Sequence, residues 1–449
     1  MLKFSGGNMD RTVRKEFWSY VSLNILGMLG LSCYILADTY FIAAKLGADG
    51  LTSLNLAISI YSFIHGTGLM IGIGGATKYA IYRSRRETKK GSQIFTAALI
   101  IGIIAGVLLF MTGIFGSRQL AFLLGAKGAV VETTEIYLKT ILCFAPCFIC
   151  NNILIAFIRN DGNPKLAMAG MLCGSLSNIL LDYVFLFPMD GGMFGAAFAT
   201  GLAPVVSMAV LSVHFFRKRN EFYFQVKCKV TRHIKEIVTL GISAFINEIS
   251  SGVVLIIFNL LILGLSGNTG VAAYGIVANL ALVALSVFTG IAQGSQPLLS
   301  HYYGKGERQT VKQIYQNTVV LAGVLGVLLI AVAFGCTDAL IRIFNSEGSE
   351  KLHDIAFTGL RLYFLGFPLA GINIVTASYQ GAVEHAGSAF TISVVRGLAA
   401  VSVLAVLLSS LFGMTGIWLA FACAEVTALL VFALLRFVSH KKPLPDLSK

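Results

Sequence analysis

Two aspartates lie inside long apolar stretches of this chain, where acidic side chains are rare. Asp38 is near the middle of CYILADTYFIAAKLG, residues 33–47, and Asp182 is in SNILLDYVFLFP, residues 177–188. Asn178 precedes Asp182 by four residues, so the two side chains share one face of a helix. Thr200, in GAAFATG, is expected at a similar depth in the next stretch. The pattern predicts that two carboxylates, an amide and a hydroxyl meet in one layer.

These four side chains are suited to cation exchange. A charged aspartate at the centre of a membrane helix costs about 2.5–3.5 kcal/mol on insertion scales, so its charge must be balanced. Two neighbouring acids can share a proton, or a hard cation can bind carboxylate, amide and hydroxyl oxygens. We predict a cation-binding and coupling site at Asp38, Asn178, Asp182 and Thr200, with Asp38 and Asp182 as ligands if the ion is Na⁺. The alternative is that Asp38 only hydrogen-bonds the backbone of a broken helix.

Three more charged residues lie within apolar stretches of the second half. They are Glu248, in AFINEISSG, Arg396 and Glu425. Each is a candidate contact for substrate or for a second cation. Alternatively, Arg396 neutralises one of the two glutamates, because buried charges occur mostly in pairs.

The sequence gives no sign of enzymatic chemistry. It contains no Walker motif, HExxH or GxSxG, which are signatures of ATP-driven or hydrolytic sites. We therefore predict no catalytic residues and no cofactor, apart from H⁺ or Na⁺ as a coupling ion.

The elements that position these residues are predicted to be membrane helices. Of 449 residues, 56% are hydrophobic and only 12% are charged, and the mean hydropathy is +0.80. A water-facing surface needs far more charge, and continuous apolar runs of about 20 residues favour helices over barrel strands. The predicted fold is an all-α polytopic membrane protein. About twelve transmembrane helices are expected, at residues 17–45, 51–80, 92–115, 133–159, 165–188, 192–216, 236–265, 270–302, 311–336, 353–380, 387–412 and 414–438.

The net charge of +13 is distributed unevenly between the two sides of the membrane. With twelve spans both termini lie on one side, and that side receives about 26 of the 34 lysines and arginines, against seven on the other. This bias obeys the positive-inside rule. It predicts a multi-pass protein of the plasma (inner) membrane with both termini in the cytoplasm, and it explains the basic charge without a nucleic-acid partner.

An internal repeat divides the chain into two halves. KLGADGLTSLNLAISI, from Lys45, resembles GLSGNTGVAAYGIVAN, from Gly264, and GMFGAAFATG, from Gly192, resembles GMTGIWLAFA, from Gly413. The offsets are 219 and 221 residues. Because each half has an even number of spans, the repeat is parallel, as in alternating-access carriers. We predict an amino-terminal lobe (1–216), a basic cytoplasmic linker (217–235), a carboxy-terminal lobe (236–438) and a cytoplasmic tail (439–449).

At these residues the chain resembles the multidrug and toxic compound extrusion (MATE) family. The likeness covers nearly the whole length, and its more specific parts are FIRNDGNPKLAM and NILLDYVF. In such proteins the matching residues form the amino-lobe cation site, which implies this role for Asp38, Asn178, Asp182 and Thr200, and some branches use a glutamate like Glu248. The stretch TGLRLYFLGFPLAGINIVTASYQG contains no acid, unlike its counterpart in the sodium-coupled NorM branch.

The expected function is secondary antiport. The resemblance implies export of amphipathic, cationic organic compounds or drugs in exchange for protons or sodium, by alternating access, from a monomer whose further partner is membrane lipid. A flippase for lipid-linked oligosaccharide is the alternative. It is usually built from about fourteen spans and lined by basic residues, and this chain has neither feature. The sequence does not decide between H⁺ and Na⁺.

Overall fold

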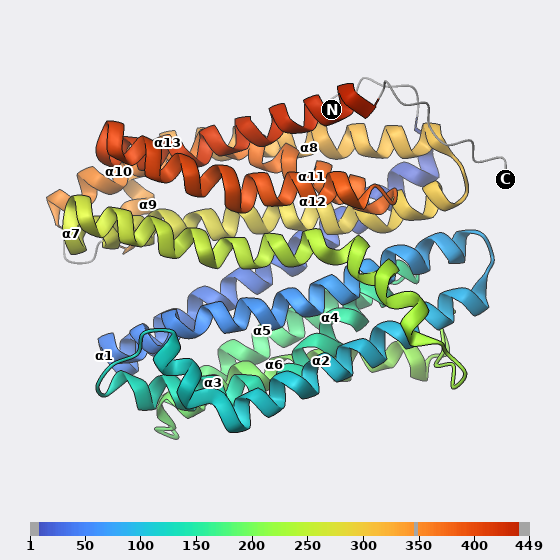
Figure 1. Cartoon of the computed structure of the whole chain (residues 1–449), viewed down its shortest axis with the longest axis horizontal. Helices are drawn as coiled ribbons and strands as arrows, with labels where there is room; N and C mark the ends of the chain where they lie inside the picture. The colour runs from blue at the N-terminus through green and yellow to red at the C-terminus, as the bar shows by residue number, and fades with distance from the viewer. Residues whose placement is uncertain (1–8, 345–348, 440–449) are drawn as a thin grey trace.

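A computed structural model describes residues 9–344 and 349–439, which form helices joined by short connections (Figure 1). Within these ranges no strand occurs, so the all-α prediction is confirmed. Seven helical segments are each long and apolar enough to cross a membrane, and two bent pairs reach that length together. The four that form simple spans are α2 (Thr88–Leu123), α5 (Pro164–Leu186), α6 (Gly192–Phe216) and α8 (Arg308–Gly335).

Three of the long segments each contain two spans. They are α1 (Arg11–Ser84), α7 (Val230–Gly304) and the segment Ala386–Leu435, most of which belongs to α13 (Ala400–Ser439); they are interrupted at Gly47, Gly267 and Gly413. These glycines have φ values of +65°, +64° and +58°, which glycine adopts at no steric cost.

The chain reverses direction at these glycines. The hydroxyl groups of Tyr34 and Tyr61, both in α1, are 2.6 Å apart, whereas 27 residues of straight helix would separate them by about 40 Å. In α7 the rings of Phe258 and Tyr274 stack with centroids 5.4 Å apart. Counting each reversal as two spans gives twelve, which confirms the predicted number.

Two spans are bent where a proline follows the break. The pair α3 (Val130–Cys143) and α4 (Ala145–Asn160) bends by 47°, and the pair α10 (Glu350–Phe364) and α11 (Phe367–Ala382) bends by 45°. Pro146 and Pro368 lie at the starts of α4 and α11. Each pair of helices breaks there because proline cannot donate the backbone hydrogen bond that would continue the preceding helix. A methyl group at Gly106 would lie 2.6 Å from Pro146 Cα, and one at Gly326 would lie 2.4 Å from Pro368 Cα. The two halves therefore repeat the same bend and the same close contact.

The remaining elements are short. The helix α9 (Thr337–Phe344) connects α8 to the next span, and α12 (Ala386–Val394) continues through a π-helical turn, η1 (Val395–Ala399), into α13. This turn contains Arg396, and no feature of the sequence predicted it.

The helices form two lobes, visible in Figure 1 as a blue-to-green bundle below a yellow-to-red one. One apolar core contains buried residues between 42 and 237, and the other contains buried residues between 258 and 424. The second core also contains Val13, Phe17 and Val21, from the start of α1. The first span therefore packs against the carboxy-terminal lobe at one end and carries Asp38 toward the amino-terminal lobe at the other. The residue boundaries predicted for the lobes, the linker and the tail stay predictions.

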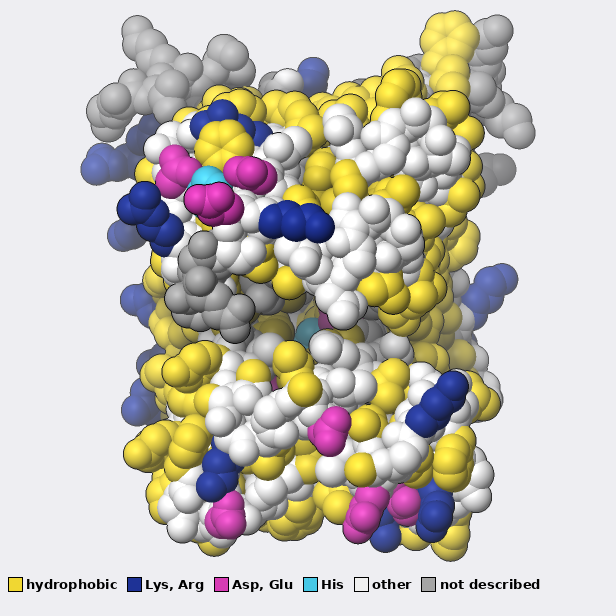
Figure 2. Space-filling view, turned by 90° about the vertical axis from the view of Figure 1, so that its left-hand side faces the viewer, with side chains coloured by type: hydrophobic (Ala, Val, Ile, Leu, Met, Phe, Trp, Pro, Cys, Tyr) yellow, Lys and Arg dark blue, Asp and Glu magenta, His cyan; other side chains and the backbone are white. Residues whose placement is uncertain are grey.

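The lobes touch closely at one end of the molecule and separate at the other. The first, which we name the terminal end, carries the start of α1 and the end of α13; the second, the glycine-turn end, carries the turns at Gly47 and Gly267. A methyl group at Gly241 would lie 1.8 Å from the carbonyl oxygen of Met70, so the two lobes meet backbone to backbone there. Figure 2, which views the glycine-turn end, shows a surface hollowed between the two lobes. The structure is therefore open at that end.

Candidate functional site

The structure brings the four predicted residues of the amino-terminal lobe together. Asn178 and Asp182 are fully buried, and Asp38 and Thr200 are only 6% and 3% exposed. The Asn178 amide donates a hydrogen bond to Thr200 Oγ1 over 3.3 Å. The Asp38 and Asp182 carboxyl groups lie close enough to interact electrostatically. Side chains from α1, α5 and α6 thus form one buried layer, which we call the carboxylate pair site.

The carboxylate pair site is rich in oxygen acceptors and poor in donors. Asp38 Oδ1, Asn178 Oδ1 and both carboxylate oxygens of Asp182 are buried without a hydrogen-bond partner among the described residues. The Thr200 hydroxyl donates to the Ala196 carbonyl oxygen over 3.1 Å, so its proton is directed away from the carboxylates. Leaving buried acceptors unsatisfied is costly. The donor set fits a proton or a hard cation, which prefers oxygen ligands.

Three tyrosines that the sequence analysis did not single out surround this site. Tyr137, from α3, is buried beside both carboxylates and interacts with Thr200. Tyr34 lies one helical turn before Asp38, and its hydroxyl group is 2.6 Å from that of Tyr61. Tyrosine is common in apolar spans as a packing residue, which hid these positions. The spacing of four residues between Tyr34 and Asp38 was the available signal.

Glu248 lies between the lobes, away from the carboxylate pair site. Its Oε1 is 3.2 Å from Nδ1 of His65, and the two side chains are 30% and 13% exposed. The His65 ring stacks on Tyr61 with centroids 5.9 Å apart. Glu248 thus reaches the open space between the lobes, and it is connected through His65 and the Tyr61–Tyr34 pair to the neighbourhood of Asp38.

Arg396 and Glu425 form a closed ion pair. Nη2 of Arg396 lies 2.7 Å from Glu425 Oε1, and its Nε donates to Oε2 over 3.3 Å. The Asn373 amide also donates to Glu425 Oε2, over 2.7 Å. Both carboxylate oxygens are therefore occupied, and Glu425 is only 1% exposed. This geometry favours the alternative in which Arg396 neutralises a glutamate, and it does not bring either residue to the carboxylate pair site.

At the terminal end, polar side chains join the two lobes. Lys78 Nζ donates to Glu384 Oε1 over 2.6 Å. Arg159, only 1% exposed, donates from Nη1 to Asn24 Oδ1 over 2.7 Å and to Gln293 Oε1 over 2.9 Å. These hydrogen bonds compensate the burial of the Arg159 guanidinium only while the two lobes are in contact. The terminal end is thus closed by side chains as well as by packed glycines.

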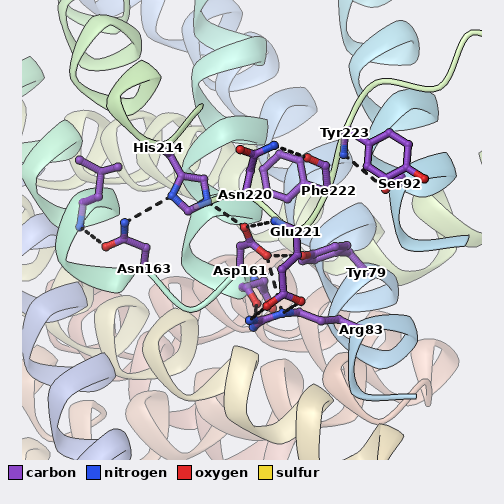
Figure 3. A network of polar contacts seen from close by, with 12 residues as sticks. Tyr79, Arg83, Ser92, Asp161, Asn163, His214, Asn220, Glu221, Phe222 and Tyr223 are labelled. Atoms are coloured by element: carbon purple, nitrogen blue, oxygen red, sulfur yellow. Dashed lines mark hydrogen bonds and ion pairs between the residues drawn. The ribbon is translucent and has the colours of Figure 1, made fainter. Parts of the chain in front are cut away.

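A buried acid at the end of α4 anchors the connection between the lobes (Figure 3). Asp161 accepts hydrogen bonds from the Tyr79 hydroxyl and, over 3.0 Å, from the backbone N–H of Glu221, and its Oδ2 lies 2.8 Å from His214 Nε2. Arg83 donates to both carboxylate oxygens of Glu221, over 2.8 and 2.6 Å. This bidentate contact lowers the pKa of Glu221. The segment after α6 is therefore attached to the amino-terminal lobe before it enters α7.

Comparisons with known proteins agree with the fold. The sequence profile of the MatE family matches residues 24–184 and 244–411. The multidrug export protein MepA of Staphylococcus saprophyticus is 28% identical over 423 residues, and MepA of Staphylococcus aureus is 26% identical over 425 residues; each alignment covers 92% of both chains.

Two solved structures share the architecture. A multidrug resistance MATE family transporter of the MOP superfamily, in an outward-facing conformation, has a TM-score of 0.89 and 21% identity, covering 96% of this chain and 97% of that one. A MOP superfamily transporter from Pyrococcus furiosus has a TM-score of 0.88, 21% identity and the same coverage of both chains. At this identity the likeness establishes the fold alone.

Proposed function

Because the chain belongs to the MATE family of multidrug efflux transporters, we propose that it is a secondary antiporter that exports amphipathic, cationic organic compounds in exchange for H⁺ or Na⁺. The observation that carries this proposal is the carboxylate pair site, in which Asp38 and Asp182 are buried together with acceptor oxygens that have no donor among the described residues. The alternative of a flippase for lipid-linked oligosaccharide is not favoured, since the relatives are named as multidrug exporters.

The first span couples cation binding to the arrangement of the lobes. It carries Asp38 in the amino-terminal lobe, while its start, at Val13 and Phe17, is part of the carboxy-terminal core. A cation entering the carboxylate pair site changes the charge beside Asp38 and so changes the packing of this span. A ligand shifts a conformational equilibrium only if it binds the two states with different affinity. We propose that cation binding in the outward-open state weakens substrate binding in the space near Glu248.

The driving force depends on the charge of the exported compound. One charge that moves through 100 mV releases about 2.3 kcal/mol, enough for a gradient of roughly fiftyfold. If the compound is itself a monovalent cation, one-for-one exchange moves no net charge and the voltage contributes nothing. The concentration gradient of the coupling ion, or a second ion, must then drive export.

The proposed orientation places the terminal end and both chain ends in the cytoplasm, in the plasma (inner) membrane. We further propose that the protein acts as a monomer, because each chain has its own pair of lobes and its own carboxylate pair site.

Efflux from sealed proteoliposomes tests the function. With tetraphenylphosphonium as the probe, we expect transport to follow an imposed pH or sodium gradient and to stop when that gradient is dissipated. Measurement with sodium present or absent, at fixed and then stepped pH, separates the two ions. Transport that is equally fast without either gradient would contradict antiport.

Reversing one charge of the Lys78–Glu384 pair is expected to open the terminal end. Lys78→Glu or Glu384→Lys places like charges where an ion pair of 2.6 Å now lies, with side chains only 17% and 28% exposed. We expect each change to shift the equilibrium away from the outward-open form by about fivefold, which corresponds to about 1 kcal/mol. The double reversal, Lys78→Glu with Glu384→Lys, is expected to restore it.

Spin-label distances across the hollow measure this shift. Labels at Asp49→Cys and Glu350→Cys, both exposed in the native protein, report on the two lobes in a background without the eight native cysteines. If the double reversal shifts the equilibrium as far as the single variant with the larger shift, the Lys78–Glu384 pair does not set the equilibrium.

A further inference from the structure

A second cavity lies between the lobes at the terminal end, and the transport proposal does not use it. Its volume is about 770 Å³. Its wall is built from five separate segments, which are the start and the end of α1, the α4–α5 connection, the segment after α6 and the end of α7. Residues of both lobes therefore contribute to it.

The charge of this cavity is strongly positive. Its only acidic wall residues are Glu16 and Glu221, and Glu221 is already bonded to Arg83. The cationic side chains in the wall are Lys15, Arg83, Arg86, Lys165, Arg219 and Lys305. Six positive charges face two negative ones, so the cavity has an excess of four.

Most of these cations lack a partner. Lys15, Arg86, Lys165 and Arg219 form no ion pair with any residue in the described ranges, unlike Lys78 and Arg396 elsewhere in the molecule. Like charges gathered around one space repel each other. An anion in the cavity would relieve that repulsion.

Arg86 lies beside the cavity in a left-handed backbone conformation, which Lys218 and Glu384 also adopt just past the ends of two other helices. Arg86 has φ of +60°, and the position related to it by the repeat, 220 residues later, is Gly306 with φ of +79°. This region is unfavourable for residues with a side chain and free for glycine. The conformation therefore belongs to the helix end, and among Arg86, Lys218 and Glu384 it is Arg86 that lines the cavity.

We propose that this cavity binds a phosphate group, that of an anionic phospholipid from the adjoining leaflet, and that the bound phosphate stabilises the closed terminal end. Guanidinium groups bind phosphate through paired N–H donors. Lys165 is in the first turn of α5, where the helix dipole also favours an anion. Anionic lipids are attracted to clusters of basic residues at the cytoplasmic surface.

The expected consequence is conformational. Arg86, Lys165 and Arg219 belong to the amino-terminal lobe and its connection, whereas Lys305 and His301 end the second span of α7. Opening the terminal end would pull these two groups of residues apart. A phosphate that contacts both groups binds the closed form more tightly and so increases its population.

Phospholipid retention by the full-length protein tests the site without a transport assay. The pocket variant is Arg86→Gly with Arg219→Gln, in which glycine relieves the strain at position 86. The matched control is Arg217→Gln with Lys218→Gln, which removes two neighbouring charges that do not line the cavity. Native mass spectrometry and thermal unfolding are measured in nanodiscs of phosphatidylcholine with or without phosphatidylglycerol.

We expect phosphatidylglycerol to be retained by the wild type and the control, and to raise their unfolding temperatures. Retention by the pocket variant is expected to be about thirtyfold weaker, at the usual contribution of two basic residues. Inorganic phosphate added to phosphatidylcholine nanodiscs forms the second arm. Protection by phosphate alone, lost in the pocket variant, would assign the site to a soluble anion.

Two results would overturn the proposal. One is equal retention of phosphatidylglycerol by the pocket variant and the control, together with no protection by inorganic phosphate. The other is that phosphatidylglycerol or inorganic phosphate raises the unfolding temperatures of the pocket variant and the control by the same amount. Lys15→Gln with Lys165→Gln gives an independent second variant, so a folding defect in one variant cannot be mistaken for loss of the site.

Discussion

Replacing Asp38 by asparagine is expected to reduce gradient-driven efflux by about a hundredfold, which approaches the upper end of typical coupling free energies of about 3 kcal/mol. The amide has nearly the same shape as the carboxyl group, but it cannot bind a proton in the pH range of transport and cannot neutralise the charge of a bound cation. Asp38 is 6% exposed and lies beside Asp182, and one remaining carboxyl group cannot form the pair that shares a proton or binds a cation. The measurement is tetraphenylphosphonium efflux from proteoliposomes under an imposed ion gradient.

The control for this experiment is Asp49→Asn. Asp49 lies 11 residues after Asp38, just past the turn at Gly47, and is exposed, so its replacement is expected to leave efflux unchanged. Asp182→Asn is expected to act in the same direction as Asp38→Asn, because the two carboxyl groups form one site. Full gradient-driven export by Asp38→Asn would remove this residue from the mechanism and would require another site for the coupling ion.

Much of the fold could be predicted because membrane helices are recognised in a sequence by the length of their apolar runs. The number of spans, the repeat and the convergence of Asp38, Asn178 and Asp182 all depend on the 3.6-residue period and on the cost of burying charge. The positions of the turns agree with the predicted gaps between spans, at residues 45–51, 265–270 and 412–414. How tightly the chain turns was not visible, because Gly47 and Gly267 are single non-helical residues between helical neighbours, and a glycine in a membrane span more often serves close packing.

Contacts between distant spans could not be predicted from one sequence. Tyr137 reaches the carboxylate pair site from α3, and nothing local distinguishes it from a packing tyrosine. Glu248 had an equally ambiguous environment, and its contact with His65 depends on how the two lobes approach each other. Pairing across an interface is a tertiary property, and helical periodicity carries no information about it.

The second large effect is expected from breaking the buried Arg396–Glu425 pair. Glu425→Gln removes the negative charge and leaves the Arg396 guanidinium, whose side chain is only 10% exposed, without a counter-charge. Removing one partner of a buried pair typically costs about 3–5 kcal/mol of unfolding free energy. We expect a loss of this size in detergent, measured by thermal or denaturant unfolding. The surface pair Arg118–Glu135, 3.9 Å apart, is the control, and Glu135→Gln is expected to cost less than about 1 kcal/mol.

A double replacement separates a structural role of this pair from a role in transport. Arg396→Met with Glu425→Leu removes both charges together, and buried pairs can often be exchanged for apolar residues at little cost. In the wild type the Asn373 amide also donates to the backbone carbonyl oxygen of Glu425 over 2.9 Å. The double variant keeps this hydrogen bond, because it does not involve the side chain at 425. If the pair only neutralises buried charge, stability and efflux both return to near the wild-type level. A stable double variant without efflux would instead place Arg396 or Glu425 in substrate or ion binding.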